Sequence, residues 1–105
     1  LLVAPKLHGS LTVFLVDNQG GGIFENLPVA GLPAFEKCFA TPQQCNFRML
    51  CEAHQIEFIT PADWPALVAL MAEPSPAGIR VIEIKTDRKR DRTIRRELLG
   101  LGPGA

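Results

Sequence analysis

The chain has 105 residues, of which 47% are hydrophobic and 21% charged, and its formal net charge is zero. This length suits one small domain, and the composition excludes both a disordered chain and one built of membrane spans. With no net charge, no overall field draws the chain to nucleic acid or to a membrane surface.

The charge is nevertheless uneven along the sequence. Residues 1–84 hold four basic and eight acidic side chains, a net of −4, whereas residues 85–105 hold seven basic and three acidic ones, a net of +4. A basic tail can bind nucleic acid. Because acidic residues interrupt this one, we favour a solvated terminal helix and keep a nucleic-acid module only as a distant alternative.

Three cysteines indicate the redox environment: Cys38, Cys45 and Cys51. An odd number without a CxxC pair suits neither a zinc site nor a disulfide framework. We therefore expect a reduced, cytoplasm-like compartment, with Cys51 as a small apolar core residue.

The first element in chain order is a strand over Leu11–Val16, a continuous apolar run typical of a strand covered on both faces. It ends in an Asp-Asn-Gln-Gly-Gly-Gly turn at 17–22, and residues 25–40 are expected to form a loop. The run is too short to cross a bilayer.

A helix follows, with Asn46 as its N-cap. Four residues then share one face: Phe47, Leu50, Cys51 and His54. Thr41 and Gln44 have capping-box spacing and leave an earlier start open. Residues 56–59 form a short candidate strand.

The next helix is expected to start with Thr60 as cap and Pro61 in its first turn. Its apolar face would hold Trp64, Leu67, Val68 and Met71. A strand follows over Ile79–Ile84. The last helix would be capped by Asp87 or Asp91, with Ile94 and Leu98 turned inward.

The order strand, loop, helix, strand, helix, strand, helix predicts an α/β fold with a parallel sheet and flanking helices. Three strands are few for a complete domain of this class. The chain also opens at Leu1 without an initiator methionine, so we expect residues 1–105 to be a fragment or processed product of a longer protein.

Ligands of parallel α/β sheets bind at the carboxyl ends of strands, where Asp17–Phe24 lies. Its glycines let the backbone approach a phosphate or a cation closely. Amide and backbone oxygens suit Mg²⁺, so Asn18 and a glycine carbonyl are sensible ligands. From these residue types alone, however, a simple turn is the more common outcome.

The exact order of residues in this segment is more specific than their types. Residues 11–28 read LTVFLVDNQGGGIFENLP, which resembles the end of the thiamine-diphosphate motif of the SEPHCHC synthase family. Further likeness to the carboxy-terminal part of that family is carried by FATPQ at 39–43, NF at 46–47 and VIEIKTDR at 81–88. The resemblance covers nearly the whole chain and is closest to cyanobacterial or plastid-type members.

The resemblance implies roles for six positions. Asn18 and the carbonyl of Gly20 would bind the metal, Gly21 and Ile23 would contact the cofactor with them, and Phe24 and Leu27 would contact substrate. One departure is Asp17, where many thiamine enzymes have asparagine; the ligand role belongs to the next position.

The implied cofactors are thiamine diphosphate and Mg²⁺ (or Mn²⁺), and the implied reaction joins decarboxylated 2-oxoglutarate to isochorismate. In the family, a Gly-Asp-Gly half-motif, substrate-binding arginines and an activating glutamate of the partner subunit complete the site, and none is expected here. The resemblance therefore implies a homo-oligomeric enzyme of menaquinone or phylloquinone biosynthesis, cytoplasmic or plastidic, with no catalytic residue in this chain and no activity of the chain alone.

Two alternatives stay open. The chain could come from another thiamine-diphosphate enzyme, such as an acetolactate synthase relative, or be a non-catalytic α/β interaction module. Among the remaining residues, His54 and Trp64 are expected to be structural. Glu25 and Glu36 have no evident partner and are expected to be surface groups of a loop.

Overall fold

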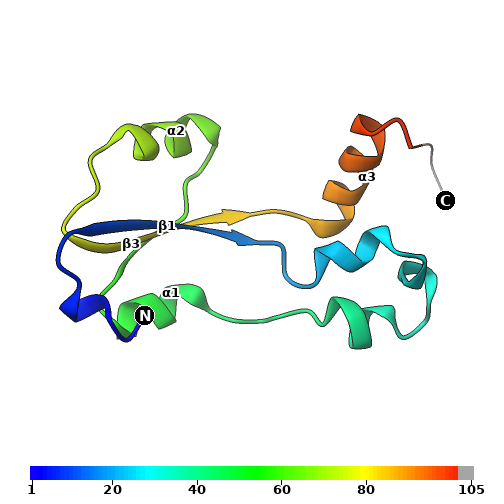
Figure 1. Ribbon diagram of the computed structural model, residues 1–105, viewed down its shortest axis with the longest axis horizontal. Helices are drawn as coiled ribbons and strands as arrows, with labels where there is room; N and C mark the ends of the chain where they lie inside the picture. Colours follow the sequence, from blue (N-terminus) through cyan, green and yellow to red (C-terminus); the bar gives the residue numbers. More distant parts are fainter. Residues whose placement is uncertain (102–105) are drawn as a thin grey trace. The chain divides into compact units, whose positions relative to one another are not determined.

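A computed structural model describes residues 1–101 (Figure 1). Three strands and three α-helices alternate along the chain: β1 (Ser10–Asp17), α1 (Phe47–Ala53), β2 (Glu57–Ile59), α2 (Trp64–Ala72), β3 (Gly78–Lys85) and α3 (Arg88–Leu98). Four short helical turns accompany them: η1 (Ala4–Lys6), η2 (Gly22–Asn26), η3 (Pro28–Gly31) and η4 (Glu36–Ala40). The order of strands and helices is the predicted one, and the segment predicted as a loop folds into η2, η3 and η4.

The chain divides into two compact units. Unit 1 comprises Leu1–Val16 and Cys45–Ile84, and unit 2 comprises Asp17–Gln44 and the residues from Lys85 onward. The sheet belongs to unit 1 and has the order β1-β3-β2, with β2 parallel to β3 and Phe58 opposite Val81. Figure 1 shows α1 and α2 on opposite sides of this sheet. The predicted α/β fold with a parallel sheet and flanking helices is confirmed.

The core of unit 1 forms around the central strand β3. Cys51, Ile56 and Val81 are its buried cluster, and Ile82 is completely buried. Four partly buried side chains pack against the cluster: Ala4, Leu15, Phe58 and Ile79. The prediction that Cys51 is a core residue is confirmed, and burial raises the pKa of its thiol.

Two charged side chains are buried in the same strand. Arg80 donates from Nη2 to the hydroxyl of Thr12 (3.3 Å) and to the carbonyl of Leu70 (3.2 Å). Glu83 accepts a hydrogen bond from the hydroxyl of Thr60 at 2.9 Å. Buried charges need such partners because they have lost their water. Through them β3 is tied to β1, to the end of α2 and to the loop after β2.

The helix starts follow from side-chain caps. Asn46 accepts from the Met49 N–H at 3.0 Å, so the predicted cap of α1 is confirmed and the alternative start at Thr41 is wrong. The predicted start of α2 at Thr60 is also wrong. Asp63 caps this helix instead, accepting from the Ala66 N–H at 2.8 Å, because the Thr60 hydroxyl donates to a buried glutamate.

The last helix, α3, is capped by Asp87, which accepts from the N–H groups of Lys89 and Arg90 at 2.9 Å each. The hydrogen bond from the Arg90 N–H is the main reason that the pKa of Asp87 lies below its ordinary value. Of the two predicted caps, Asp87 is therefore confirmed. No described helix combines the length and the apolar character needed to cross a bilayer.

Several apolar side chains predicted to face inward are exposed within the described residues. On β1 they are Leu11, Val13, Phe14 and Val16; on α2, Trp64, Val68 and Met71; on α3, Ile94 and Leu98. The prediction of a first strand covered on both faces is thus wrong for this chain, because Leu11 and Val13 on one face and Phe14 and Val16 on the other stay exposed. Of the apolar face predicted for α2, only Leu67 is buried.

We expect Ile82→Ala to lower the free energy of unfolding by about 2–5 kcal/mol, since it opens a cavity in β3, the central strand of the described sheet. Chemical denaturation followed by circular dichroism measures this loss. The control Val68→Ala shortens a side chain that is 61% exposed and should change stability by less than about 0.5 kcal/mol. Equal losses for both variants would contradict the assignment of the core.

Candidate functional site

The candidate site begins in the turn after β1, within unit 2. Two side chains fold this turn: Asp17 Oδ1 accepts from the Gln19 N–H at 3.0 Å, and Asn18 Oδ1 accepts from the Gly20 N–H at 3.2 Å. Such Asx turns replace backbone hydrogen bonds and let the chain reverse quickly. Gln19 consequently takes a left-handed conformation, with φ of 56°.

Close backbone approach explains the first two glycines. Gly20 has φ of 143°, and a Cβ there would stand 2.5 Å from the carbonyl oxygen of Ala40. At Gly21 a Cβ would stand 2.6 Å from the ring of Phe24, while its N–H donates to the Ala40 carbonyl at 2.7 Å. The glycine turn is therefore held directly against the end of η4, with no space for side chains between them.

The structure brings only part of the predicted site residues together. Asn18 and Ile23 line one pocket of about 260 Å³. The other residues of its wall are Gly22, Asn26, Arg88, Asp91, Arg92 and Arg95. Phe24 packs edge-on against the ring of Phe39, at 6.0 Å between centroids, and Leu27 is half exposed. These two do not line the pocket that holds Asn18.

The oxygens at the turn suit a hard cation. Asn18 Oδ1 and the Gly20 carbonyl each accept one hydrogen bond, the latter from the Gly22 N–H at 2.9 Å, and each keeps a second lone pair. Two neutral oxygens are a partial ligand set for Mg²⁺, which also takes water and phosphate oxygens. Residues 1–101 contain no cluster of three His, Cys, Asp or Glu side chains that could hold a metal. The Asn18 side-chain oxygen and the Gly20 carbonyl oxygen are thus of the kind that a magnesium diphosphate takes as ligands.

An ion-pair cluster lies next to this turn, and the sequence analysis missed it. Arg88, at the start of α3, donates from Nη1 to Glu25 in η2 and from Nη2 to Glu36 in η4. Lys89 adds a contact to Glu36 at 3.3 Å. The expectation that Glu25 and Glu36 have no partner is wrong, and Glu25 is buried; Glu36 is exposed, as expected of a surface group. Contacts across 63 and 52 residues leave no signal in local spacing.

Burial makes the two ion pairs unequal. The side chains of Arg88 and Glu25 are 11% and 5% exposed, whereas that of Glu36 is 47% exposed. The hydrogen bond from Arg88 holds the pKa of Glu36 below its ordinary value, and the same bond raises the pKa of Arg88. Loss of Arg88 would leave Glu25 buried without a counter-charge, a change that costs about 3–5 kcal/mol in such pairs.

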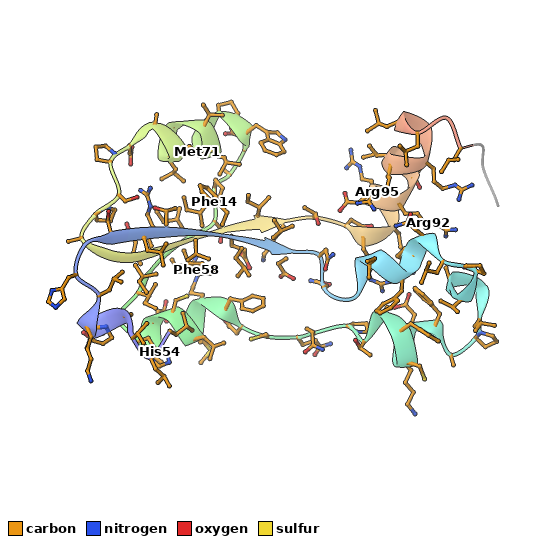
Figure 2. The ribbon with its side chains drawn as sticks, viewed as in Figure 1. Phe14, His54, Phe58, Met71, Arg92 and Arg95 are labelled. Carbon is orange, nitrogen blue, oxygen red and sulfur yellow. The ribbon has the colours of Figure 1, made fainter. Side chains whose placement is uncertain are left out.

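A second, larger pocket adjoins the same cluster. It measures about 900 Å³, and Glu25 and Glu36 lie in its wall, whereas Arg88 lies in the wall of the smaller pocket. Arg92 lines both pockets, and its Nε is buried without a hydrogen-bond partner among the described residues. Figure 2 shows Arg92 and Arg95 on α3. The ion pairs of Arg88 thus stand where the two pockets meet.

Comparison with known proteins gives the family. No protein-family model matches the chain. The 2-succinyl-5-enolpyruvyl-6-hydroxy-3-cyclohexene-1-carboxylate (SEPHCHC) synthase of Rippkaea orientalis is 45% identical over 91 residues, and that of Synechococcus sp. JA-3-3Ab is 50% identical over 99 residues. These alignments cover 86% and 92% of the chain. The chain matches a fragment of SEPHCHC synthase.

The alignments cover most of this chain but only a small part of each relative. The chain spans 15% of the length of the Rippkaea SEPHCHC synthase and 16% of that of the Synechococcus enzyme. The SEPHCHC synthase of Thermosynechococcus vestitus, 40% identical over 99 residues, is spanned to 18%. The resemblance read from the sequence is thereby confirmed for the family, while the roles of single residues stay predictions.

We expect Gly20→Ala to destabilise unit 2 by about 1–3 kcal/mol, because the residue has positive φ and the new methyl group meets the Ala40 carbonyl. Hydrogen exchange of the amides around residues 18–22 and 40 measures the local loss. Gly31→Ala is the matched control, since nothing lies within 4 Å of its Cβ position. Equal protection in both variants would show that the close approach is unimportant.

Unit 2 should also lose one contribution to its stability in acid. The lowered pKa of Glu36 means that its ion pairs stabilise the fold fully above its ordinary value of 4.5 and progressively less as pH falls through the lower folded value. We expect Glu36→Gln to lower the melting temperature at pH 7 but not below that lowered pKa. Glu73→Gln, which removes an exposed carboxylate after α2, is the control. A pH-independent difference would contradict the ion pairing.

Proposed function

We propose that this chain acts as the carboxy-terminal part of the thiamine-diphosphate-binding domain of a SEPHCHC synthase. Such an enzyme would join decarboxylated 2-oxoglutarate to isochorismate in menaquinone or phylloquinone biosynthesis. The observation that carries the proposal is the glycine turn after β1, which presents the oxygens of Asn18 and Gly20 in a chain that matches SEPHCHC synthases over most of its length.

The residues of the turn would divide the work of binding. Asn18 and the Gly20 carbonyl would hold Mg²⁺ (or Mn²⁺), which anchors and orients a diphosphate rather than activating water. Gly21 would allow close approach of the cofactor, and Ile23 would contact it from the pocket wall that it shares with Asn18. When bound, thiamine diphosphate would supply the electron sink that decarboxylation of a 2-oxo acid requires.

Phe24 and Leu27 are proposed to contact the substrate. Phe24 is held in place by the ring of Phe39, whereas Leu27 leaves half of its side chain exposed and available for contact. Neither can move a proton, and the Asn18 turn holds no histidine. The chain's contribution to the reaction would therefore be binding and orientation.

The remaining catalytic groups would come from other segments of a longer polypeptide and from a second subunit. This proposal includes a homo-oligomer, a cytoplasmic or plastid location, and no activity of residues 1–105 alone. The part of the proposal that places further catalytic groups outside the chain is supported by its short span within the SEPHCHC synthases. A non-catalytic module would also present only two metal donors, and the experiment below separates it from the enzyme.

The test is calorimetric titration of thiamine diphosphate with Mg²⁺ into the longer polypeptide that carries this chain. We expect Asn18→Ala to weaken binding at least tenfold, because it removes one of two metal donors, and residues 1–105 alone to bind neither ligand. Asn26→Ala is the matched control: the same residue type, exposed, on the rim of the same pocket. Unchanged binding by Asn18→Ala would leave the non-catalytic module as the better account.

A further inference from the structure

We propose that Arg88 is a positioning residue of the candidate site: its two ion pairs fix η2, and with it the side chains of Asn18 and Ile23. The inference rests on the proposed function, in which these two residues contact the metal and the cofactor. Arg88 shares the pocket wall with these two residues, and its proposed role is to hold them in place through η2.

The geometry makes one guanidinium the junction of three segments. Its Nη1 binds Glu25 of η2 and its Nη2 binds Glu36 of η4, while its own backbone begins α3. α3 also packs directly on η2. Because a guanidinium is planar and its donors point in fixed directions, the two carboxylates are held at a set separation. A lysine at this position could bind either carboxylate but could not impose that separation.

The burial of Glu25 makes η2 the segment that Arg88 holds most firmly. Glu25 follows directly after Ile23 and Phe24 in the chain, and its side chain is 5% exposed. Water therefore cannot replace Arg88 as its partner, and the segment is fixed wherever the guanidinium lies. The side chain of Glu36 is 47% exposed, so water can take the place of Arg88 as its partner. The contact to Glu36 therefore serves mainly to fix the orientation of the guanidinium.

Gly22 is a close neighbour of both Arg88 and Asn18. A Cβ built on Gly22 would stand 2.7 Å from Asn18 Nδ2 and 3.4 Å from Arg88 Cβ. The side chains of Asn18 and Arg88 therefore both approach the Gly22 backbone, at the start of η2. A shift of η2 relative to α3 would therefore turn the Asn18 amide, whose Oδ1 is the proposed metal donor.

The experiment uses the longer polypeptide that carries this chain and compares Arg88→Met with three references. Arg90→Met removes the same charge from an exposed position of the same helix. Arg88→Lys keeps the charge without the planar fork. Leu67→Ala opens a cavity in unit 1 and reports what loss of stability alone does. For each variant, calorimetry gives the dissociation constant of thiamine diphosphate with Mg²⁺, and a thermal melt gives stability without ligand.

We expect Arg88→Met to weaken binding at least tenfold at a temperature where the protein is still folded, and Arg88→Lys to restore only part of the loss. Arg90→Met and Leu67→Ala should bind within twofold of the unchanged protein. If Arg88→Met does not fold, Glu36→Gln decides, because it releases one side of the guanidinium without leaving a buried charge. We expect a loss of at least threefold for that variant.

Binding by Arg88→Met within twofold of the unchanged protein, while Asn18→Ala loses it, would overturn the positioning role and leave the proposed function standing. If Arg88→Met is unfolded, binding by Glu36→Gln within twofold of the unchanged protein would likewise overturn the positioning role. If Asn18→Ala also leaves binding intact, the proposed function itself is wrong.

Discussion

The central position of β3 is the constraint on which unit 1 depends. A strand with neighbours on both edges and helices on either side loses its water, so every polar group that it carries needs a protein partner. Arg80 and Glu83 meet part of this demand from the same strand, one through the Thr12 hydroxyl and the Leu70 carbonyl, the other through the Thr60 hydroxyl. Arg80 Nε is buried without a hydrogen-bond partner among the described residues. Those bonds tie β3 to its neighbours, and the bond from Thr60 accounts for the cap of α2 lying at Asp63 instead of Thr60.

Two kinds of interaction organise unit 2, and they act at neighbouring places. Steric exclusion shapes the glycine turn, where backbone touches backbone at Gly20 and Ala40. Electrostatic attraction shapes its surroundings, where Arg88 gathers two acidic segments. Arg88 lies in the wall of the pocket that Asn18 also lines, so one side chain both joins the acidic segments and lines the pocket.

Local signals were sufficient for the elements whose ends are determined by their own side chains. The caps Asn46 and Asp87, the apolar run of β1 and the glycine turn all read directly from neighbouring residues, and the structure agrees. The cap of α2 was misplaced because Thr60 bonds to a residue 23 positions away. The ion pairs of Glu25 and Glu36 were missed for the same reason, since only tertiary contact brings Arg88 to them. The spacing of apolar residues also overestimated burial on α2 and α3. Such spacing shows which side chains share a face of the helix, but not whether another element packs on that face.

The family was predicted from the exact residues of one segment, which the physical properties of those residues alone would not have indicated. A strand followed by glycines is common, and its residue types gave only a weak indication of a metal site. The geometry adds that two of these glycines, Gly20 and Gly21, are required by contacts and not merely tolerated. It also separates Phe24 from the pocket wall that holds Asn18 and Ile23, which no spacing rule could have indicated.

The burial of Cys51 has a consequence for the thiol chemistry of the chain. Cys38 and Cys45 are exposed, whereas Cys51 lies in the core of unit 1 with its ionisation suppressed. Because the thiolate is the reactive form, an alkylating reagent meets two available thiols in the folded chain and a third only when unit 1 opens. The sequence thus carries a built-in reporter of its own local unfolding.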